Sequence, residues 1–471
     1  MRLAATLVWL ISTGVSLGQM SEPPGIHQLE WEAHRGAPVS ADRFVAGLHA
    51  PSVTLIEPAG AGLTSRPTKA IFGYLPYWER DTAGANLRWD LLTHLACFSV
   101  GVNSNGTLGT MNGWPSSWTS LVNTAHANGV KVILVATNFT PTSIYTLITS
   151  TKYKNAFFTN ITNQMIAGNA DGLNIDFEGS NSPTWRSEIN GFMAELTAYL
   201  HAQNPNWEVS FAGPAVNWSS SWDLPGLAAS CDYIFIMGYA FYGSWSGTSG
   251  PCAPLDPAPG GSICIRNTVE TQYDLVTHNT PDKLILGLPY YGGQWKTETS
   301  EAYSTVVSWV GSTRFRDDAA TSLSRGLLWD GFSQTPWYTW HDGTDWRQVW
   351  FDNDVSLGLK YQLAQDHDYR GVGMWALNYD GSRGELWDEL GRRFGPDWVA
   401  SPPDLDGDGD VDQSDFGQFQ LCLTGSDVVQ WNHACSPARL DRDLDVDVDD
   451  AARFVNCLSG EGQAPASDCA Q

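Results

Sequence analysis

Eight short apolar runs alternate with helix-like segments between residues 68 and 395. Each run has the length of a buried strand. The runs cover residues 70–74, 92–98, 130–135, 173–178, 208–212, 233–237, 284–288 and 371–375. Helical periodicity separates most of them, as at 185–201, where one stripe holds Ile189, Met193, Leu196 and Leu200. Eight strands alternating with helices over ~330 residues predict an α/β fold, a (β/α)8 TIM barrel, rather than a doubly wound sheet.

The stretch between the seventh and eighth predicted strands, residues 292–370, is long. It contains strand-like pieces of its own at 326–329 and 337–340. A structureless loop of this length is unusual inside a compact domain. We therefore predict an α+β insertion between strands 7 and 8.

The first 18 residues have the features of a secretory signal peptide. Arg2 supplies the positive charge, residues 3–15 are apolar, and the small residues Ser16 and Gly18 precede the expected cleavage point. The apolar stretch is too short to span a membrane, and no later segment reaches the ~20 apolar residues that a span needs. These features predict a secreted protein. Residues 19–67, rich in Pro, Gly, Ala and Ser, predict a loose N-terminal extension.

The charge of the chain limits its partners. Lys and Arg total 26 against 51 Asp and Glu, a net charge of −25. This excess disfavours nucleic acid and anionic membranes and favours a neutral ligand or a cation. The 22 tryptophans suit sugar stacking and the core of a large barrel equally well.

Eight cysteines are consistent with an exported protein. Cys252 and Cys264 bracket a Pro/Gly-rich loop, and we predict that they form a disulfide. Cys97 and Cys231 lie in or beside apolar runs and are predicted to be buried free thiols. The remaining cysteines recur at nearly the same spacing in the C-terminal region, as Cys422 with Cys435 and Cys457 with Cys469.

The fourth predicted strand carries acidic groups on one face only. Side chains alternate along a strand, so one face holds Leu173, Ile175 and Phe177. The other face holds Asn174, Asp176 and Glu178. Two adjacent carboxylates cannot both ionise freely, so the pKa of one rises and that group becomes a candidate general acid. The alternative, a solvated edge strand, is disfavoured because the opposite face is so apolar.

At these residues the chain resembles glycoside hydrolase family 18, the chitinase-like enzymes. Asp171, Gly172, Asp176 and Glu178 match the fixed positions of the family's Asp-Gly-x-Asp-x-Asp-x-Glu motif. Most members have Asp where this chain has Asn174, and the Asn form is similar to the di-N-acetylchitobiase branch. The resemblance covers about residues 68–395.

Other predicted strands add to the resemblance. Residues 235–239 are similar to the sixth strand with its Met-x-Tyr, although Ala240 stands where most members have Asp. Residues 287–292 and 371–375 match the seventh and eighth strands, whereas 136–139 lacks the usual Ser-x-Gly-Gly. The resemblance implies a substrate site that includes Trp375, Met237, Tyr74 and Tyr290.

The resemblance also implies a substrate-assisted, retaining mechanism, which departs from the usual two-carboxylate scheme. Glu178 would protonate the glycosidic oxygen and later activate water, while the substrate's 2-acetamido oxygen attacks the anomeric carbon. Asp176 would orient the acetamido N–H, and Tyr239 would hold its carbonyl. Asn174 can only form hydrogen bonds. No cofactor is needed for this chemistry.

The implied substrate is chitin or a chito-oligosaccharide, cut at β-1,4 bonds next to N-acetylglucosamine. One alternative is a peptidoglycan or N-glycan hydrolase of the same mechanism. Another is a non-catalytic chitinase-like lectin. Lectins of this kind usually lose the acidic Glu, so the presence of Glu178 favours an enzyme.

A second domain follows the barrel. Residues 396–403 predict a linker, whose adjacent prolines favour an extended spacer. Residues 404–471 then contain a calcium-loop pattern, with Gly409 at the sharp turn and Asp410 ligating through its backbone. The side-chain ligands are Asp404, Asp406, Asp408, Asp412 and Asp415.

The calcium-loop pattern repeats 35 residues later. The second loop holds Asp441, Asp443, Asp445, Asp447 and Asp450. It departs from the pattern with Arg439 at position 1 and Leu444 at position 6. The pair of repeats resembles a dockerin module, a small all-α domain, which implies calcium and a cohesin-like protein partner. The alternative is a disordered acidic tail.

Overall fold

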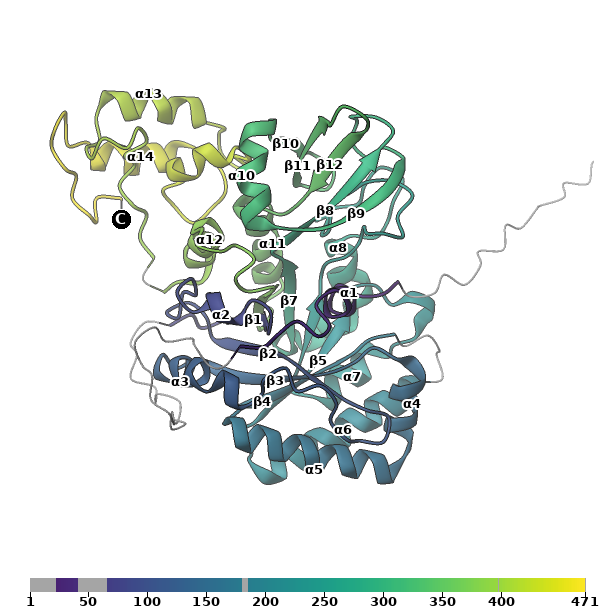
Figure 1. The fold of residues 1–471 in the computed structure, drawn as a ribbon. Coiled ribbons are helices and arrows are strands. Elements are labelled where there is room, and N and C mark those ends of the chain that lie inside the picture. Colours follow the sequence, from purple (N-terminus) through teal and green to yellow (C-terminus); the bar gives the residue numbers. More distant parts are fainter. Residues whose placement is uncertain (1–22, 41–65, 180–184, 397, 471) are drawn as a thin grey trace, which may run out of the picture.

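The structure is a computed structural model that describes residues 23–40, 66–179, 185–396 and 398–470. Its centre is a closed barrel of eight parallel strands (Figure 1). In chain order they are β1 (Ala70–Pro76), β2 (His94–Gly101), β3 (Lys131–Asn138), β4 (Gly172–Phe177), β5 (Glu208–Pro214), β6 (Tyr233–Met237), β7 (Leu284–Pro289) and β13 (Gly371–Trp375). Pairing of β1 with β13 closes the barrel, which confirms the predicted fold and all eight predicted strands.

Helices connect the strands and cover the barrel from outside (Figure 1). The stripe predicted at 185–201 lies on α6, and its four apolar side chains are buried. No helix in the described parts of the chain is long and apolar enough to cross a membrane. The connecting helices are α2 (Arg80–Ala83), α3 (Thr119–Ala127), α4 (Pro141–Thr149), α5 (Thr151–Gly168), α6 (Arg186–Gln203), α7 (Leu224–Ser230), α8 (Ile265–Asn267), α9 (Asp274–Asn279), α11 (Asp354–Asp366) and α12 (Glu385–Phe394).

A buried carboxylate network fills the N-terminal end of the barrel. Glu208, at the start of β5, lies 3.0 Å from His94 Nε2 and 2.5 Å from Lys131 Nζ. It also accepts hydrogen bonds from the Tyr233 hydroxyl and the Arg370 guanidinium. Burial alone would raise the pKa of Glu208, but His94 and Lys131 bring it below its ordinary value. The network satisfies a charge that would otherwise be costly to bury.

An α+β insertion lies between β7 and β13, as predicted. Its antiparallel sheet has the order β10-β11-β12-β8-β9, and its own small core contains Trp295, Trp337 and Trp350. The elements are β8 (Tyr291–Thr297), β9 (Val306–Arg314), α10 (Phe315–Arg325), β10 (Leu328–Asp330), β11 (Thr335–His341) and β12 (Trp346–Trp350).

The N-terminal extension contains a helix that the sequence did not predict, α1 (Ile26–Ala33). The helix is not loose: Ile26, His27 and Glu30 are buried, and it lies against the barrel (Figure 1). The prediction of a loose extension is therefore wrong for these residues. The predicted signal peptide, residues 1–18, lies outside the described residues.

One of the two cysteine predictions is confirmed and the other is wrong. Disulfides join Cys422 to Cys435 and Cys457 to Cys469, and Cys97 and Cys231 are buried free thiols. Cys252 and Cys264, predicted to pair, are also buried free thiols. The Cys264 sulfur instead caps α8 by accepting the Asn267 N–H at 3.3 Å. Cysteines that bracket a loop need not face each other, because spacing in the sequence does not fix their separation in space.

The C-terminal module, residues 404–470, is helical. Its main helices are α13 (Gln413–Cys422) and α14 (Val448–Cys457). Phe419 and Phe454, which the repeat aligns, have ring centroids 4.9 Å apart in the core of the module. This packing confirms the register of the repeat and excludes a disordered tail.

The linker and the second repeat pack against the barrel. The ring of Trp398 in the predicted linker contacts the guanidinium groups of both Arg392 and Arg442. Arg439 Nη2 lies 2.6 Å from the Asp354 carboxylate on α11, and both side chains are buried. Leu444 packs over Gly358 of the same helix. The two departures from the calcium-loop pattern are therefore contacts between the module and the barrel.

Candidate active site

Four strands bring the predicted catalytic residues to one end of the barrel, where barrel enzymes carry their active sites. β4 supplies Asn174 and Asp176, and Glu178 follows directly after it. The other strands supply Tyr74 from β1, Trp375 from β13 and, just beyond β6, Tyr239. The alternation predicted for β4 is confirmed, because Leu173, Ile175 and Phe177 belong to the apolar core.

The carboxylate pair consists of a fully buried Asp176 and a Glu178 at the wall of a cavity. Burial raises the pKa of Asp176 well above its ordinary value, while a hydrogen bond with Glu178 opposes this rise. A buried pair coupled in this way holds a proton at neutral pH more readily than exposed carboxyls do. The arrangement can therefore supply a general acid.

Asn174 is fixed by hydrogen bonds at both ends of its amide. Its Oδ1 accepts from the Tyr74 hydroxyl at 2.8 Å, and its Nδ2 donates to Ser210 Oγ at 2.9 Å. All three side chains are buried. Asn174 therefore connects β1, β4 and β5 beneath the carboxylate pair.

Tyr239 and Trp375 lie near the pair. We call the space that these two residues enclose with Asp176 and Glu178 the chamber. Burial raises the pKa of Tyr239 well above its ordinary value, so its hydroxyl remains a hydrogen-bond donor. Trp375 is fully buried, and its ring contacts those of Tyr74 and Phe98. A flat indole in this position is suited to support a sugar ring.

One predicted substrate residue lies elsewhere. Tyr290 is buried near Tyr361 and Asp380 and does not line the cavity beside Glu178, so its role in substrate binding stays a prediction. Tyr291, the next residue, lies nearer, with its ring centroid 6.2 Å from that of Tyr239. Side chains of successive extended residues point in opposite directions. Met237, in contrast, lines the cavity as predicted.

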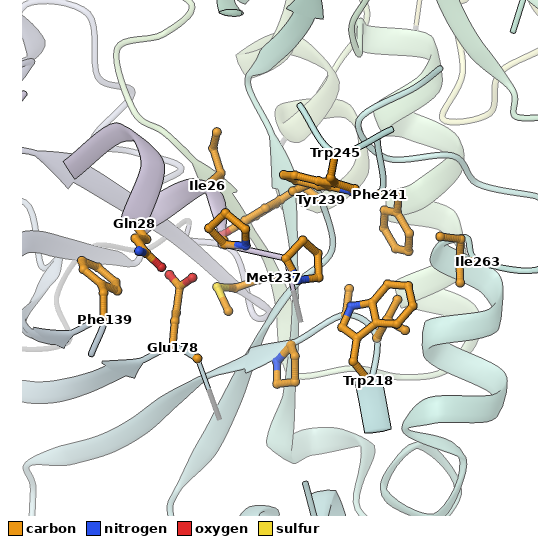
Figure 2. A pocket seen from close by; sticks show the side chains of 18 of the residues that line it. Ile26, Gln28, Phe139, Glu178, Trp218, Met237, Tyr239, Phe241, Trp245 and Ile263 are labelled. Carbon is orange, nitrogen blue, oxygen red and sulfur yellow. The ribbon is translucent and has the colours of Figure 1, made fainter. Parts of the chain in front are cut away.

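A cavity of about 300 Å³ opens beside Glu178. Figure 2 shows Glu178 and Phe139 at one end and Trp218 and Ile263 at the other. Trp245 and Phe241 add further aromatic surface to its wall. Aromatic walls next to a proton donor suit the binding of an uncharged sugar chain.

Helix α1 contributes side chains to the site that the sequence did not predict. His27 Nδ1 lies 2.9 Å from Asp176, and its Nε2 lies 2.7 Å from the Tyr239 hydroxyl. The His27 ring also lies over Trp375, with centroids 3.9 Å apart. Burial lowers the pKa of His27 to about 4, although Glu178 and Glu30 oppose this shift. The imidazole is therefore neutral at pH 7.

Glu30, one turn further along α1, is also held by the site. Its carboxylate accepts hydrogen bonds from Trp375 Nε1 at 3.2 Å and from the Tyr379 hydroxyl. Arg314 of β9 lies 3.1 Å from it. Glu30 therefore ties α1 both to the barrel and to the insertion.

The acidic residues of the C-terminal module form four groups whose carboxylate oxygens lie within 4.8 Å of one another. Asp415 belongs to both groups of the first loop, and Asp450 to both groups of the second. Asp408, predicted as a ligand, is in none of them. The groups are Asp404, Asp406 and Asp415; Asp410, Asp412 and Asp415; Asp441, Asp443 and Asp450; and Asp445, Asp447 and Asp450.

Two features of these loops suit a hard cation. Gly409 has a φ of +95°, the left-handed turn predicted at position 6. Asp410 and Asp445 are buried, and Oδ1 of each has no hydrogen-bond partner among the described residues. Buried carboxylate oxygens normally have partners, so these two fit a site that binds a metal ion.

Comparisons with known proteins agree with this geometry. The family described as glycosyl hydrolases family 18 matches residues 70–380. Probable di-N-acetylchitobiase 2 of Dictyostelium discoideum is 29% identical over 261 residues, covering 48% of this chain and 66% of that protein. Di-N-acetylchitobiase of Homo sapiens is 29% identical over 258 residues, covering 47% and 63%. The chain thus spans just under two thirds of these relatives.

The fold also matches solved structures. The crystal structure of Ostrinia furnacalis Group IV chitinase in complex with allosamidin superimposes with a TM-score of 0.59 at 20% identity. The match covers 68% of this chain and 94% of that one. At this identity the likeness supports the fold alone.

Proposed function

Because the chain belongs to glycosyl hydrolases family 18, we propose that it hydrolyses β-1,4 bonds next to N-acetylglucosamine. Chitin or chito-oligosaccharides are the substrate class. The observation that carries the proposal is the convergence of Asp176, Glu178, Tyr239 and Trp375 on one chamber beside an aromatic cavity. Relatives named di-N-acetylchitobiase support short oligosaccharides as substrates.

The mechanism we propose is substrate-assisted and retaining. Glu178 protonates the glycosidic oxygen, and the substrate's 2-acetamido oxygen forms the new bond to the anomeric carbon as the old bond breaks. Asp176 accepts the acetamido N–H, and the Tyr239 hydroxyl donates to its carbonyl. Glu178 then removes a proton from the water that opens the oxazolinium ring. Each protein group acts by position and proton transfer, with no cofactor in the reaction.

A substrate panel tests the proposal. The purified chain is incubated with N-acetylglucosamine oligomers, peptidoglycan and an N-glycosylated protein, and the products are followed by NMR. We expect cleavage of the oligomers with the β-anomer released first. Release of the α-anomer would contradict the retaining mechanism, and cleavage of peptidoglycan alone would contradict the substrate class.

The C-terminal module is proposed to bind calcium and a protein partner. Asp404, Asp406, Asp410, Asp412 and Asp415 would hold the ion or ions of the first loop, where calcium would neutralise the carboxylates. Its exposed apolar side chains support a docking role with a cohesin-like protein; they include Leu421, Val448, Val455 and Leu458. Export from the cell is also part of the proposal, and it rests on residues 1–18.

A further inference from the structure

We propose that residues 23–33 are an internal ligand of the sugar site and hold most molecules in a closed state that cannot bind substrate. This inference rests on the proposed function, because it assigns the chamber around Trp375 to the sugar. In the closed state the segment occupies that chamber, and substrate enters only after α1 leaves.

The first argument is the position of His27. Its two ring nitrogens contact Asp176 and the Tyr239 hydroxyl at 2.9 and 2.7 Å. A neutral imidazole has one N–H donor and one acceptor nitrogen, the same pair of functions as an amide. His27 therefore satisfies the two groups that would hold an acetamido group. Its ring also covers Trp375, so no sugar ring can lie there at the same time.

The second argument is the close approach of the backbone at Gly25. A Cβ added to Gly25 would overlap the carboxylate of Glu178. The φ of Gly25 is −65°, which any residue adopts, so the glycine serves close approach and not an unusual turn. The backbone thus covers the proposed acid. Pro23, Pro24 and Ile26 also line the remaining cavity.

The third argument is the nature of the buried face of α1. A helix that only covered a barrel would bury apolar residues, yet α1 buries His27 and Glu30 beside Ile26. Buried polar groups are stable only where partners satisfy them. Here the partners are Asp176, Tyr239, Trp375 and Arg314, three of which form the chamber itself.

The barrel does not need α1 for closure. β1 is paired with β2 on one edge and with β13 on the other, and all eight strands form the closed barrel without any residue of α1. Arg314 also has a second carboxylate partner, Glu79, at 3.5 Å. Departure of α1 therefore leaves the barrel intact and exposes the chamber.

Two variants open the site in different ways. Gly25→Val places atoms where the Glu178 carboxylate lies and so opposes docking of the segment by steric overlap. The double variant His27→Ala and Glu30→Ala removes its contacts with the chamber. The matched control is Glu32→Ala, on the exposed face of the same helix, whose side chain contacts Gln28.

Hydrogen exchange is the readout that does not depend on the sugar. In the unmodified chain we expect amides of residues 26–33 to exchange slowly, as for a docked helix. Both opening variants should speed their exchange at least about tenfold, while barrel peptides and the control remain unchanged. Fast exchange in the unmodified chain would overturn the proposal.

Hydrolysis of an N-acetylglucosamine tetramer is the second readout. The apparent affinity for substrate is proportional to the open fraction of the chain. A rise in that fraction should therefore increase kcat/KM about tenfold or more in both opening variants. Equal kcat/KM in all four chains would overturn the closed state. If α1 is released and no chain cleaves the tetramer, the proposed substrate is wrong and the internal ligand stands.

Discussion

The Tyr74 hydroxyl donates a hydrogen bond of 2.8 Å to the side-chain carbonyl of Asn174, on the strand that carries Asp176. Asn174 also donates to Ser210. A carboxylate at this position could keep both contacts, since the tyrosine and serine hydroxyls can each donate to it. The position can therefore accept a charge without rearrangement of its neighbours.

Replacing Asn174 with Asp should move the alkaline limb of the kcat/KM profile to higher pH. A new negative charge beneath Asp176 and Glu178 makes it harder to remove the proton that the pair holds. The pKa of Asp176 is already raised by burial, so the added charge acts in the same direction. Hydrolysis measured from pH 4 to 9 for both chains checks this prediction. An unchanged limb would show that Asn174 does not affect the acid.

Replacing Glu178 with Gln should lower kcat by about 10²–10⁴-fold, because the proton donor is lost while the shape is kept. Binding of an N-acetylglucosamine oligomer should change little. Calorimetry and initial rates, both in the Gly25→Val background, separate the two effects. A comparable rate in the variant would rule out Glu178 as the acid.

Removal of calcium should loosen the C-terminal module. A cation that binds only the folded loops stabilises them by about 2.7 kcal/mol at a concentration 100 times its Kd. Amides of 404–415 should therefore exchange faster in chelator, whereas amides of β1 to β7 serve as the internal control. The two disulfides limit the loss, so we expect partial unfolding. Hydrogen exchange of 404–415 that the chelator leaves unchanged would argue against the first loop as a metal site.

Replacing Arg439 with Asp should detach the module from the barrel, even though it restores the ligand type expected at position 1. The change places a carboxylate beside Asp354 and Glu389, in a buried interface where the Arg439 guanidinium now pairs with both. Breaking a buried pair costs about 3–5 kcal/mol. Small-angle scattering should show a larger radius of gyration, and Lys152→Asp, on the distant α5, is the control. An unchanged radius would mean that other contacts suffice.

Replacing Glu208 with Gln should destabilise the barrel by about 3 kcal/mol at pH 7, because His94, Lys131 and Arg370 lose their shared anion. The pKa of Glu208 is lowered in the folded chain. Its stabilising effect is therefore complete above the ordinary glutamate pKa and is lost as the pH falls. Urea unfolding at several pH values should show the difference narrowing toward pH 3. A difference that grows in acid would contradict the network.

The strands and the acidic motif were predictable because both depend on short-range patterns. Hydrophobic runs set the strands, and alternation placed Asp176 and Glu178 on the inner face. His27 and Glu30 could not be found in this way. Polar residues at i and i+3 look like a solvated helix face, and only the distant chamber makes their burial favourable. Tyr290 follows the last residue of β7 directly, and its side chain lies near Tyr361 and Asp380, which the short-range pattern could not show.

The sequence shows that the second repeat departs from the calcium-loop pattern, but the contacts that these two residues make depend on the barrel. The structural role of Arg439 and of Leu444 cannot be inferred from the loop in which each lies. Their partners, Asp354 and Gly358, lie more than 80 positions earlier in the chain on α11. Long-range contacts of this kind leave no periodic signal in one sequence.

The contact between Arg439 and Asp354 also limits how far the barrel, with the cavity beside Glu178, can rotate relative to the C-terminal module. A domain on a free tether samples many orientations, and that freedom is lost again in every encounter between a docked enzyme and its polymer. In this chain the orientational entropy is lost once, during folding. A partner bound to the C-terminal module would therefore hold the cavity in one orientation and at one distance. Cleavage would then be confined to the part of the substrate polymer that faces the cavity.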